Sequence, residues 1–149
     1  MTRSKRMQSV AGLAKNREDN AARLLGERRK FLEQQKQRLA ELMMYREEYA
    51  KKFQNTGHQG LTIPQLNEYR HFLIKLNMAI VQQREHIDLA IDDCQLFKQK
   101  WLDSRVHTQA LDKVVEKYRN HEIKIRERKE QKELDESAAR LGLSSFKDS

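Results

Sequence analysis

Histidines, the single cysteine and neighbouring carboxylates are the side chains of this chain that could support catalysis or hold a metal ion. The five histidines are scattered, at positions 58, 71, 86, 107 and 121. His86 could be grouped with Asp92 and Asp93 as ligands, but residues 86 and 93 lie two helical turns apart and both aspartates are expected to be solvated. The sequence has no glycine-rich phosphate loop, nucleophile elbow or Cys/His metal spacing. We therefore predict no catalytic residue, no cofactor and no metal site, and a protein that is not an enzyme.

Cys94 is the only cysteine, so an internal disulfide is excluded and a reducing compartment such as the cytosol is favoured. In the helical repeat described below, Cys94 occupies a core position, where a thiol acts as a small apolar group. Trp101 occupies an equivalent position and is expected to fill the same core.

The composition of the chain predicts long helices and few turns. Of 149 residues, five are glycine and one is proline, whereas 35% are charged and 38% are hydrophobic. An average domain contains about 12% glycine and proline together, so β-sandwiches, barrels and wound α/β folds are disfavoured. The length suits one domain, which we place at residues 1–149, and a compact core with an enclosed active-site pocket is not expected.

Turn-forming residues are concentrated between positions 54 and 64, which marks a loop between two helices. Thr62 and Gln65 have the spacing of a capping box, and Pro64 lies in the first turn of the helix that follows. We predict helix one over about 8–54, a loop over about 55–63, helix two over about 64–136 and a flexible C-terminal tail over about 137–149.

Apolar residues recur along the second helix with the 3.5-residue period of a coiled coil. Counting heptad a positions from Leu66 and d positions from Tyr69, fourteen of the eighteen a and d positions up to residue 125 are apolar. The first helix has a broader apolar stripe, which is interrupted by Arg28, Gln35 and Arg38.

These patterns predict an all-α fold in which two long helices form an antiparallel coiled-coil hairpin. A parallel homodimer of two long helices is the competing arrangement. Pairing outward from the loop places residue 53 near residue 66 and residue 10 near about residue 109. It leaves the segment beyond about residue 115 without a partner in the same chain.

The formal net charge of +8 is unevenly distributed. Residues 1–30 contribute +6 and residues 113–149 contribute +2, whereas residues 31–112 sum to zero. Because both termini of a hairpin lie at one end, the positive charge is expected at the open end, where it would favour an anionic partner; the charged residues could equally solvate exposed helical faces.

The N-terminal segment is acid-free over its first fifteen residues, as a mitochondrial presequence would be, but the helical pattern continues unbroken into Glu18 and Asp19. The longest apolar stretch near the start, residues 10–14, is too short for a signal peptide or a membrane span. Direct insertion into a membrane is therefore not expected.

Both sides of the loop carry more apolar residues than one helical seam requires. Nine of the fifteen residues from 39 to 53 and ten of the sixteen from 66 to 81 are apolar, whereas a seam uses two or three positions in seven. Either some of these side chains are exposed and bind another protein, which the tyrosines and phenylalanine favour, or the core is locally wider.

Several of these residues resemble, in order and spacing, the flagellar FliJ family of type III export proteins. The resemblance covers most of residues 10–110 and rests on the run Ala21–Glu27, on Leu42, Tyr45 and Tyr49, on Tyr69, Phe72, Leu76, Ala79 and Ile80, and on Trp101. It implies a cytoplasmic antiparallel coiled coil, similar to the stalk subunit of rotary ATPases and located peripherally at the inner face of the membrane at the flagellar base. It also implies four kinds of partner: the export ATPase FliI, its regulator FliH, the export gate protein FlhA and export chaperones.

The resemblance places a gate-binding patch near the loop, at Leu42, Tyr45, Tyr49, Phe72, Leu76 and Ala79. Two neighbouring positions, Arg38 and Gln83, depart from the polar types that often stand there in the family. The open end would enter or cap the ATPase ring, and the residues that we assign to this contact are Leu13, Arg17, Arg23, Leu24 and Arg28.

On this interpretation the chain is monomeric alone and binds no nucleic acid. Two alternatives belong to other classes: a basic helical hairpin that binds nucleic acid, and a generic coiled-coil scaffold. Phosphate binding would weaken steeply with salt, and a scaffold dimer would have twice the monomer mass in solution.

Overall fold

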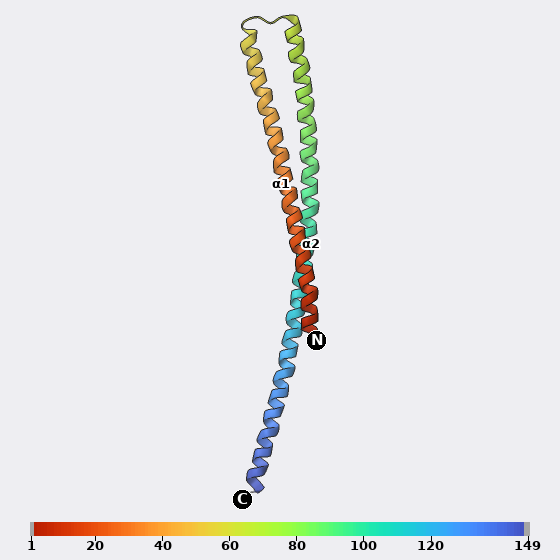
Figure 1. Cartoon of the computed structure of the whole chain (residues 1–149), viewed down its shortest axis with the longest axis vertical. Helices are drawn as coiled ribbons and strands as arrows, with labels where there is room; N and C mark the ends of the chain where they lie inside the picture. The colour runs from red at the N-terminus through yellow and green to blue at the C-terminus, as the bar shows by residue number, and fades with distance from the viewer. Residues whose placement is uncertain (1, 148–149) are drawn as a thin grey trace. The chain divides into compact units, whose positions relative to one another are not determined.

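Two long α-helices make up the fold. The structure, a computed structural model, describes the backbone of residues 2–147 and the side chains of residues 2–142. Helix α1 runs over Arg3–Gly57 and helix α2 over Ile63–Lys147 (Figure 1). The described residues contain no strand. The prediction of an all-α fold with two long helices is therefore confirmed.

Helix α1 begins five residues earlier than the predicted start at about residue 8. The reason is Thr2, which acts as an N-cap: its hydroxyl accepts a hydrogen bond from the backbone N–H of Lys5 at 3.3 Å, and its carbonyl accepts one from Arg6 at 3.2 Å. A threonine hydroxyl in this position satisfies one of the N–H groups that the first helical turn leaves free.

Helix α2 continues to Lys147, beyond the predicted end at about residue 136. Residues 137–147 are helical where the sequence predicted a tail from about residue 137, and residues 148 and 149 lie outside the described part. Ala138, Ala139 and Leu141 are strong helix formers, and the single Gly142 costs only about 1 kcal/mol relative to alanine. A hydrogen bond of 3.0 Å from Gln131 to Asp135, four residues apart, adds local support.

The loop between the helices is shorter than predicted, and its chemistry is as predicted. The backbone N–H of Thr62 donates to Gln65 Oε1 at 3.0 Å, and the N–H of Gln65 donates to Thr62 Oγ1 at 3.3 Å. This is the reciprocal pair of a capping box. Gly60 has a φ of 93°, a left-handed conformation that side-chain-bearing residues adopt only with strain. The capping box starts α2, and Gly60 lies in the turn that follows the end of α1 at Gly57.

Replacing Thr62 with alanine is expected to lower the free energy of unfolding by about 0.5–2 kcal/mol, because the substitution removes the N-cap of α2. Thr56→Ala is the matched control, since the Thr56 hydroxyl bonds the Lys52 carbonyl within α1 and caps nothing. Urea denaturation followed by circular dichroism measures both. Equal stabilities of the two variants would contradict a capping role for Thr62.

The chain divides into two compact units where the sequence predicted one domain: unit 1 contains residues 1–18 and 103–149, and unit 2 contains residues 19–102. Side chains of a coiled coil contact only the residues directly across the seam, so contacts separate readily along its length.

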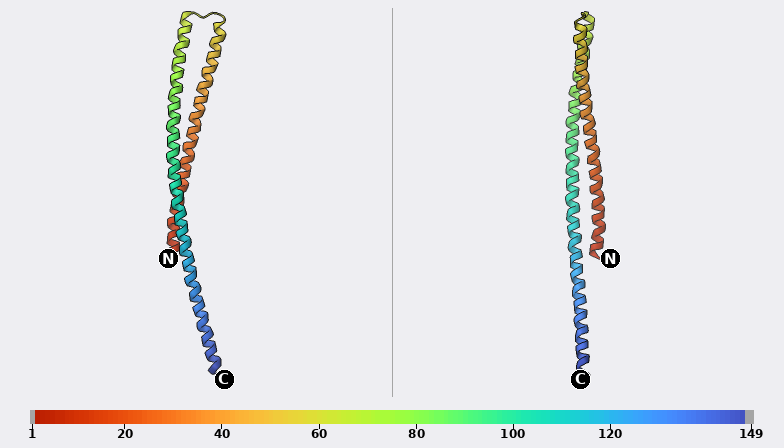
Figure 2. Two further views of the ribbon diagram at one scale, coloured as in Figure 1. Left: turned by 180° about the vertical axis from the view of Figure 1, so that it is seen from behind. Right: turned by 90° about the vertical axis from the view of Figure 1, so that its left-hand side faces the viewer.

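Unit 2 is an antiparallel helical hairpin. The last part of α1 and the first part of α2 lie side by side and run in opposite directions from the loop (Figure 1 and Figure 2). Its seam buries Leu25 and Gln35 of α1 against Leu76, Ile80, Gln83 and Ala90 of α2. Gln83 Nε2 donates to both the carbonyl oxygen and the side-chain Oε1 of Gln35, each at 2.9 Å. This buried amide pair fixes the register of the two helices.

Unit 1 packs residues near the N-terminus against α2. Its buried residues are small, namely Ser4, Ala11 and Ala14 of α1 with Thr108 and Val115 of α2. Ser4 bonds Glu122, so the paired part of α2 extends further than the predicted limit at about residue 115. Equal steps from the predicted pairs would set residue 4 opposite residue 115, so the observed partner of Ser4 lies seven residues further along α2 than predicted.

Candidate partner-binding surfaces

An aromatic cluster joins the two helices of unit 2 next to the loop. Tyr49 stacks on Tyr69 with ring centroids 5.3 Å apart, and Phe53 stacks on Tyr69 at 3.6 Å. Phe72 contacts Tyr49 at 4.3 Å and Tyr45, edge to face, at 5.8 Å. Such pairs add about 0.5–1.5 kcal/mol each beyond the burial of their area. The cluster therefore holds the loop end of the hairpin together while part of it remains accessible.

Exposure within the predicted gate-binding patch is unequal. Tyr45 is 51% exposed. Leu42, Tyr49, Phe72 and Ala79 are half-buried. Of these five, only Tyr45 presents most of its side chain to solvent.

Leu76, the sixth member of the patch, is 7% exposed and belongs to the seam. It occupies a heptad d position, which faces the partner helix. Its side chain therefore contributes to the patch only through packing in the seam. The same applies to Gln83, which is buried and bonded to Gln35 rather than exposed beside the patch.

The predicted excess of apolar residues is partly exposed. Exposed members on α1 include Met43 and Met44, and those on α2 include Ile74, Met78 and Val81. Ile74, Met78 and Val81 lie outside the a and d positions of the α2 heptad repeat, which is the signal that separates them from Leu76. The family resemblance did not include them.

The residues assigned to the ATPase contact belong to two different units. In unit 1, Leu13 is 63% exposed and Arg17 is exposed. In unit 2, Arg23 and Arg28 are exposed and Leu24 is half-buried. The structure thus does not define the five as one surface.

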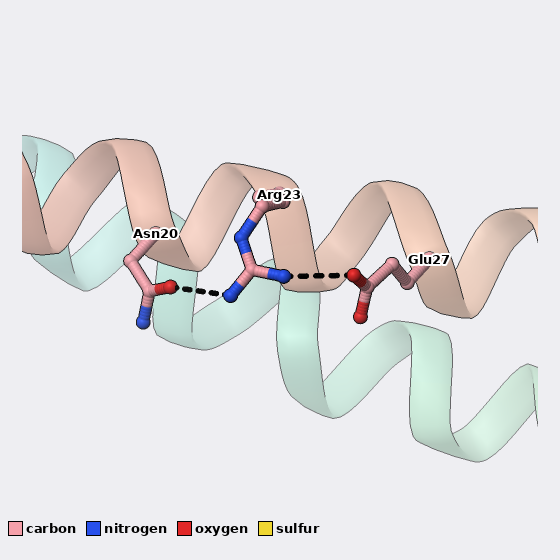
Figure 3. Close-up of polar contacts among 3 residues, drawn as sticks. All are labelled: Asn20, Arg23 and Glu27. Atoms are coloured by element: carbon pink, nitrogen blue, oxygen red, sulfur yellow. Dashed lines mark hydrogen bonds and ion pairs between the residues drawn. The ribbon is translucent and has the colours of Figure 1, made fainter.

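Arg23 is held along the surface of α1 by neighbours on its own helix. Its guanidinium donates to Asn20 Oδ1 and to Glu27 Oε1, each at 2.8 Å (Figure 3). Exposed pairs of this kind contribute about 0.3–0.5 kcal/mol. The two bonds orient the arginine, and breaking them to reach a partner would cost little.

Arg28 is tied instead to α2. Its guanidinium lies 3.4 Å from Asp93 Oδ2 and 4.8 Å from the centre of the Phe97 ring. An arginine that combines an ion pair with an aromatic face links the two helices. Arg28 therefore has a structural role within unit 2.

Two hydrogen bonds link Ser4 on α1 to Glu122 on α2 within unit 1. The Ser4 hydroxyl donates to Glu122 Oε2 at 2.7 Å, and the backbone N–H of Ser4 donates to Oε1 at 3.2 Å. The hydroxyl bond, and then the backbone bond, lower the pKa of Glu122 below its usual value, with smaller contributions from His121 and Arg119. The carboxylate also lies at the positive N-terminal end of α1.

We expect the Ser4–Glu122 link to weaken in acid. Because folding lowers the pKa of Glu122, its contribution to stability is complete above the pKa of the unfolded chain and is lost as the pH falls through the lowered, folded value. Titration of the Glu122 carboxyl by NMR should show this, and Ser4→Ala should move the pKa back toward its usual value. An unchanged pKa in Ser4→Ala would contradict the hydrogen-bond origin.

A groove of about 710 Å³ lies in unit 1. The residues that line it are mainly of basic or polar type and include Arg3, Lys113, Lys117, His121 and Lys124, with Glu116 and Glu122. Within the described residues, no helix is long and apolar enough to cross a bilayer.

Comparison with known proteins gives concordant matches over nearly the whole chain. The model of the family "Flagellar FliJ protein" matches residues 3–145. A flagellar FliJ protein of Escherichia coli (strain K12) is 27% identical over 135 residues, which cover 91% of this chain and 92% of the relative. A flagellar FliJ protein of Salmonella typhi is 26% identical over 137 residues, which cover 92% of this chain and 93% of the relative. No solved structure gives a significant match.

Proposed function

Because the chain belongs to the flagellar FliJ protein family, we propose that it is a non-enzymatic component of the flagellar type III export apparatus that connects the export ATPase to the export gate. In this role it binds the ATPase FliI with its regulator FliH, contacts the gate protein FlhA and assists the cycling of export chaperones, at the inner face of the membrane at the flagellar base. The aromatic cluster beside the loop is the observation that carries the proposal.

The gate contact is proposed to centre on Tyr45. Tyr45 is half-exposed, and its ring packs edge to face with the ring of Phe72. Phe72 in turn contacts Tyr49. A rigid aromatic side chain loses little conformational entropy on binding, which is why tyrosine is enriched among residues that dominate interface energies. Four half-buried residues complete the contact with the parts of their side chains that are accessible: Leu42, Tyr49, Phe72 and Ala79. Leu76 packs in the core and stabilises this surface.

The ATPase contact is proposed to involve the exposed residues Leu13 and Arg17 of unit 1. A separate contact is proposed at the exposed Arg23 and the half-buried Leu24 of unit 2. Unit 1 carries 16 basic and 11 acidic residues, so its surface attracts acidic groups. Arg28 is already bonded to Asp93 and contributes to this contact only by stabilising the helix pair.

Binding of the purified chain to the gate protein FlhA, measured by isothermal titration calorimetry, tests the gate contact. Tyr45→Ala is expected to weaken binding by about 2 kcal/mol, or about thirtyfold, and to reduce flagellar secretion in cells. Met44→Ala is the matched control, because Met44 is an exposed apolar neighbour on the same helix outside the patch. Unchanged affinity of the Tyr45 variant for FlhA would contradict the proposed contact with the gate protein.

Binding to the ATPase is tested separately with Arg17→Glu. Reversing this exposed charge is expected to weaken binding to FliI and to leave binding to FlhA unchanged. Arg29→Glu serves as the control, since it makes the same change at an exposed arginine of the same helix that is not assigned to the contact. If both variants bind FliI equally well, the assigned contact is wrong.

A further inference from the structure

The outward face of α2 in unit 2 carries a line of exposed apolar side chains. Their exposed fractions range from 53% to 65%, and the residues are Ile74, Met78, Val81, Leu89 and Leu96. They span 22 helical steps, or about 33 Å at 1.5 Å per residue. We refer to these five residues as the outer stripe.

The outer stripe points away from the seam. In the heptad repeat whose a position is Ile80 and whose d positions are Leu76 and Gln83, the stripe residues occupy positions b, c and f. These positions lie opposite a and d on a helix. The other helix of unit 2 packs on the a and d side, so it does not cover the stripe.

Acidic residues accompany the stripe. Positions b, c and f between residues 74 and 96 hold five apolar residues and three exposed acidic residues, namely Glu85, Asp88 and Asp92, but only one basic residue, Lys75. None of the ion pairs described for the chain involves these three carboxylates. The face is therefore apolar and negative in a chain whose net charge is +8.

We propose that the outer stripe is a docking site for an amphipathic α-helix of another protein, with its apolar side bordered by lysine and arginine. A helix that packs along α2 would cover the apolar side chains as a third helix of the coiled coil. Its lysine and arginine side chains would lie close to Glu85, Asp88 and Asp92. Charge complementarity of this kind directs both partner choice and orientation.

The charges also argue against a second copy of this chain as the occupant. An antiparallel pairing of the stripe with itself, centred on residue 85, would set Glu85 against Glu85 and would leave Asp88 and Asp92 without cations. Like charges placed opposite one another destabilise an interface. The stripe also lies on a different face of α2 from the gate-binding patch, since Phe72 and Ala79 occupy heptad position g.

The proposal is tested with the full-length chain and two synthetic helical peptides of about 21 residues, followed by fluorescence anisotropy. Both peptides have leucine at positions a and d; one has lysine at positions e and g, and the other has glutamate. The lysine peptide is expected to bind at least about tenfold more tightly than the glutamate peptide. Equal affinity for both peptides would overturn the proposal.

Variants locate the site. Met78→Gln combined with Leu89→Gln should weaken binding of the lysine peptide at least about tenfold while leaving helicity unchanged, because both side chains are exposed. Val106→Gln, at an equally exposed apolar residue outside the stripe, is the matched control. Replacement of Glu85, Asp88 and Asp92 by lysine should reverse the peptide preference. If the double variant binds like the wild type, or if sedimentation equilibrium shows a dimer that the double variant abolishes, the proposal is refuted.

Discussion

Ile80→Ala is expected to lower the free energy of unfolding by about 2–5 kcal/mol. The Ile80 side chain is only 1% exposed and is the largest fully buried side chain of the chain's described part. It occupies a heptad a position in unit 2, where four residues of the facing helix surround an inserted side chain. Truncation removes three carbons and leaves a cavity that two rigid helices fill poorly, so transfer and cavity costs add.

Urea denaturation followed by circular dichroism measures the loss of unfolding free energy. Two further variants are measured for comparison. Ile80→Val should cost only about 0.5–1.5 kcal/mol, because one methylene group is lost. Ile74→Ala makes the same chemical change on the same helix at an exposed position and should alter stability by less than about 1 kcal/mol. Equal losses at residues 74 and 80 would show that Ile80 is not in a packed core.

The heptad repeat predicted most of what stabilises the fold. Among the α2 side chains that the structure describes, up to residue 142, all six buried ones lie at predicted a or d positions: Leu76, Ile80, Gln83, Ala90, Thr108 and Val115. The repeat succeeds because in a coiled coil burial follows directly from position on the helix. The antiparallel arrangement followed from the loop chemistry around Thr62, which the structure confirms.

The helix ends were less predictable for local reasons. Thr2 caps α1 only because a helix begins directly after it. A threonine by itself does not predict where a helix begins. The far end of α2 has no strong stop signal, since Gly142 stands alone among helix formers. Propensity alone does not decide between a frayed tail and a continued helix in such a segment.

The amide pair in the seam shows what the sequence could not provide. Gln35 and Gln83 each interrupt an apolar pattern, and each is by itself a polar residue facing a core. Only the register of the two helices reveals that they are partners, bonded at 2.9 Å. The family resemblance had placed Gln83 beside an exposed patch, whereas the structure buries it. Order and spacing along a chain identify a family, but they do not say which face of a helix a residue occupies.

Leu76→Ala and Tyr45→Ala are expected to separate stability from recognition in the gate-binding patch. Leu76 is 7% exposed, so its truncation should cost about 2–5 kcal/mol of unfolding free energy. Tyr45→Ala removes a half-exposed ring at the edge of the cluster, so stability should change by no more than about 1 kcal/mol while binding to FlhA falls about thirtyfold.

The comparison is made at a temperature at which both variants remain folded, with stability from urea denaturation and affinity from calorimetry on the same samples. There, Leu76→Ala should bind FlhA nearly as well as the wild type, because its side chain acts through the core. Leu76→Met, which conserves volume, should restore most of the lost stability. If Leu76→Ala is fully stable yet loses the gate protein, its side chain must turn outward to meet the partner, and the seam of unit 2 must open when the chain binds.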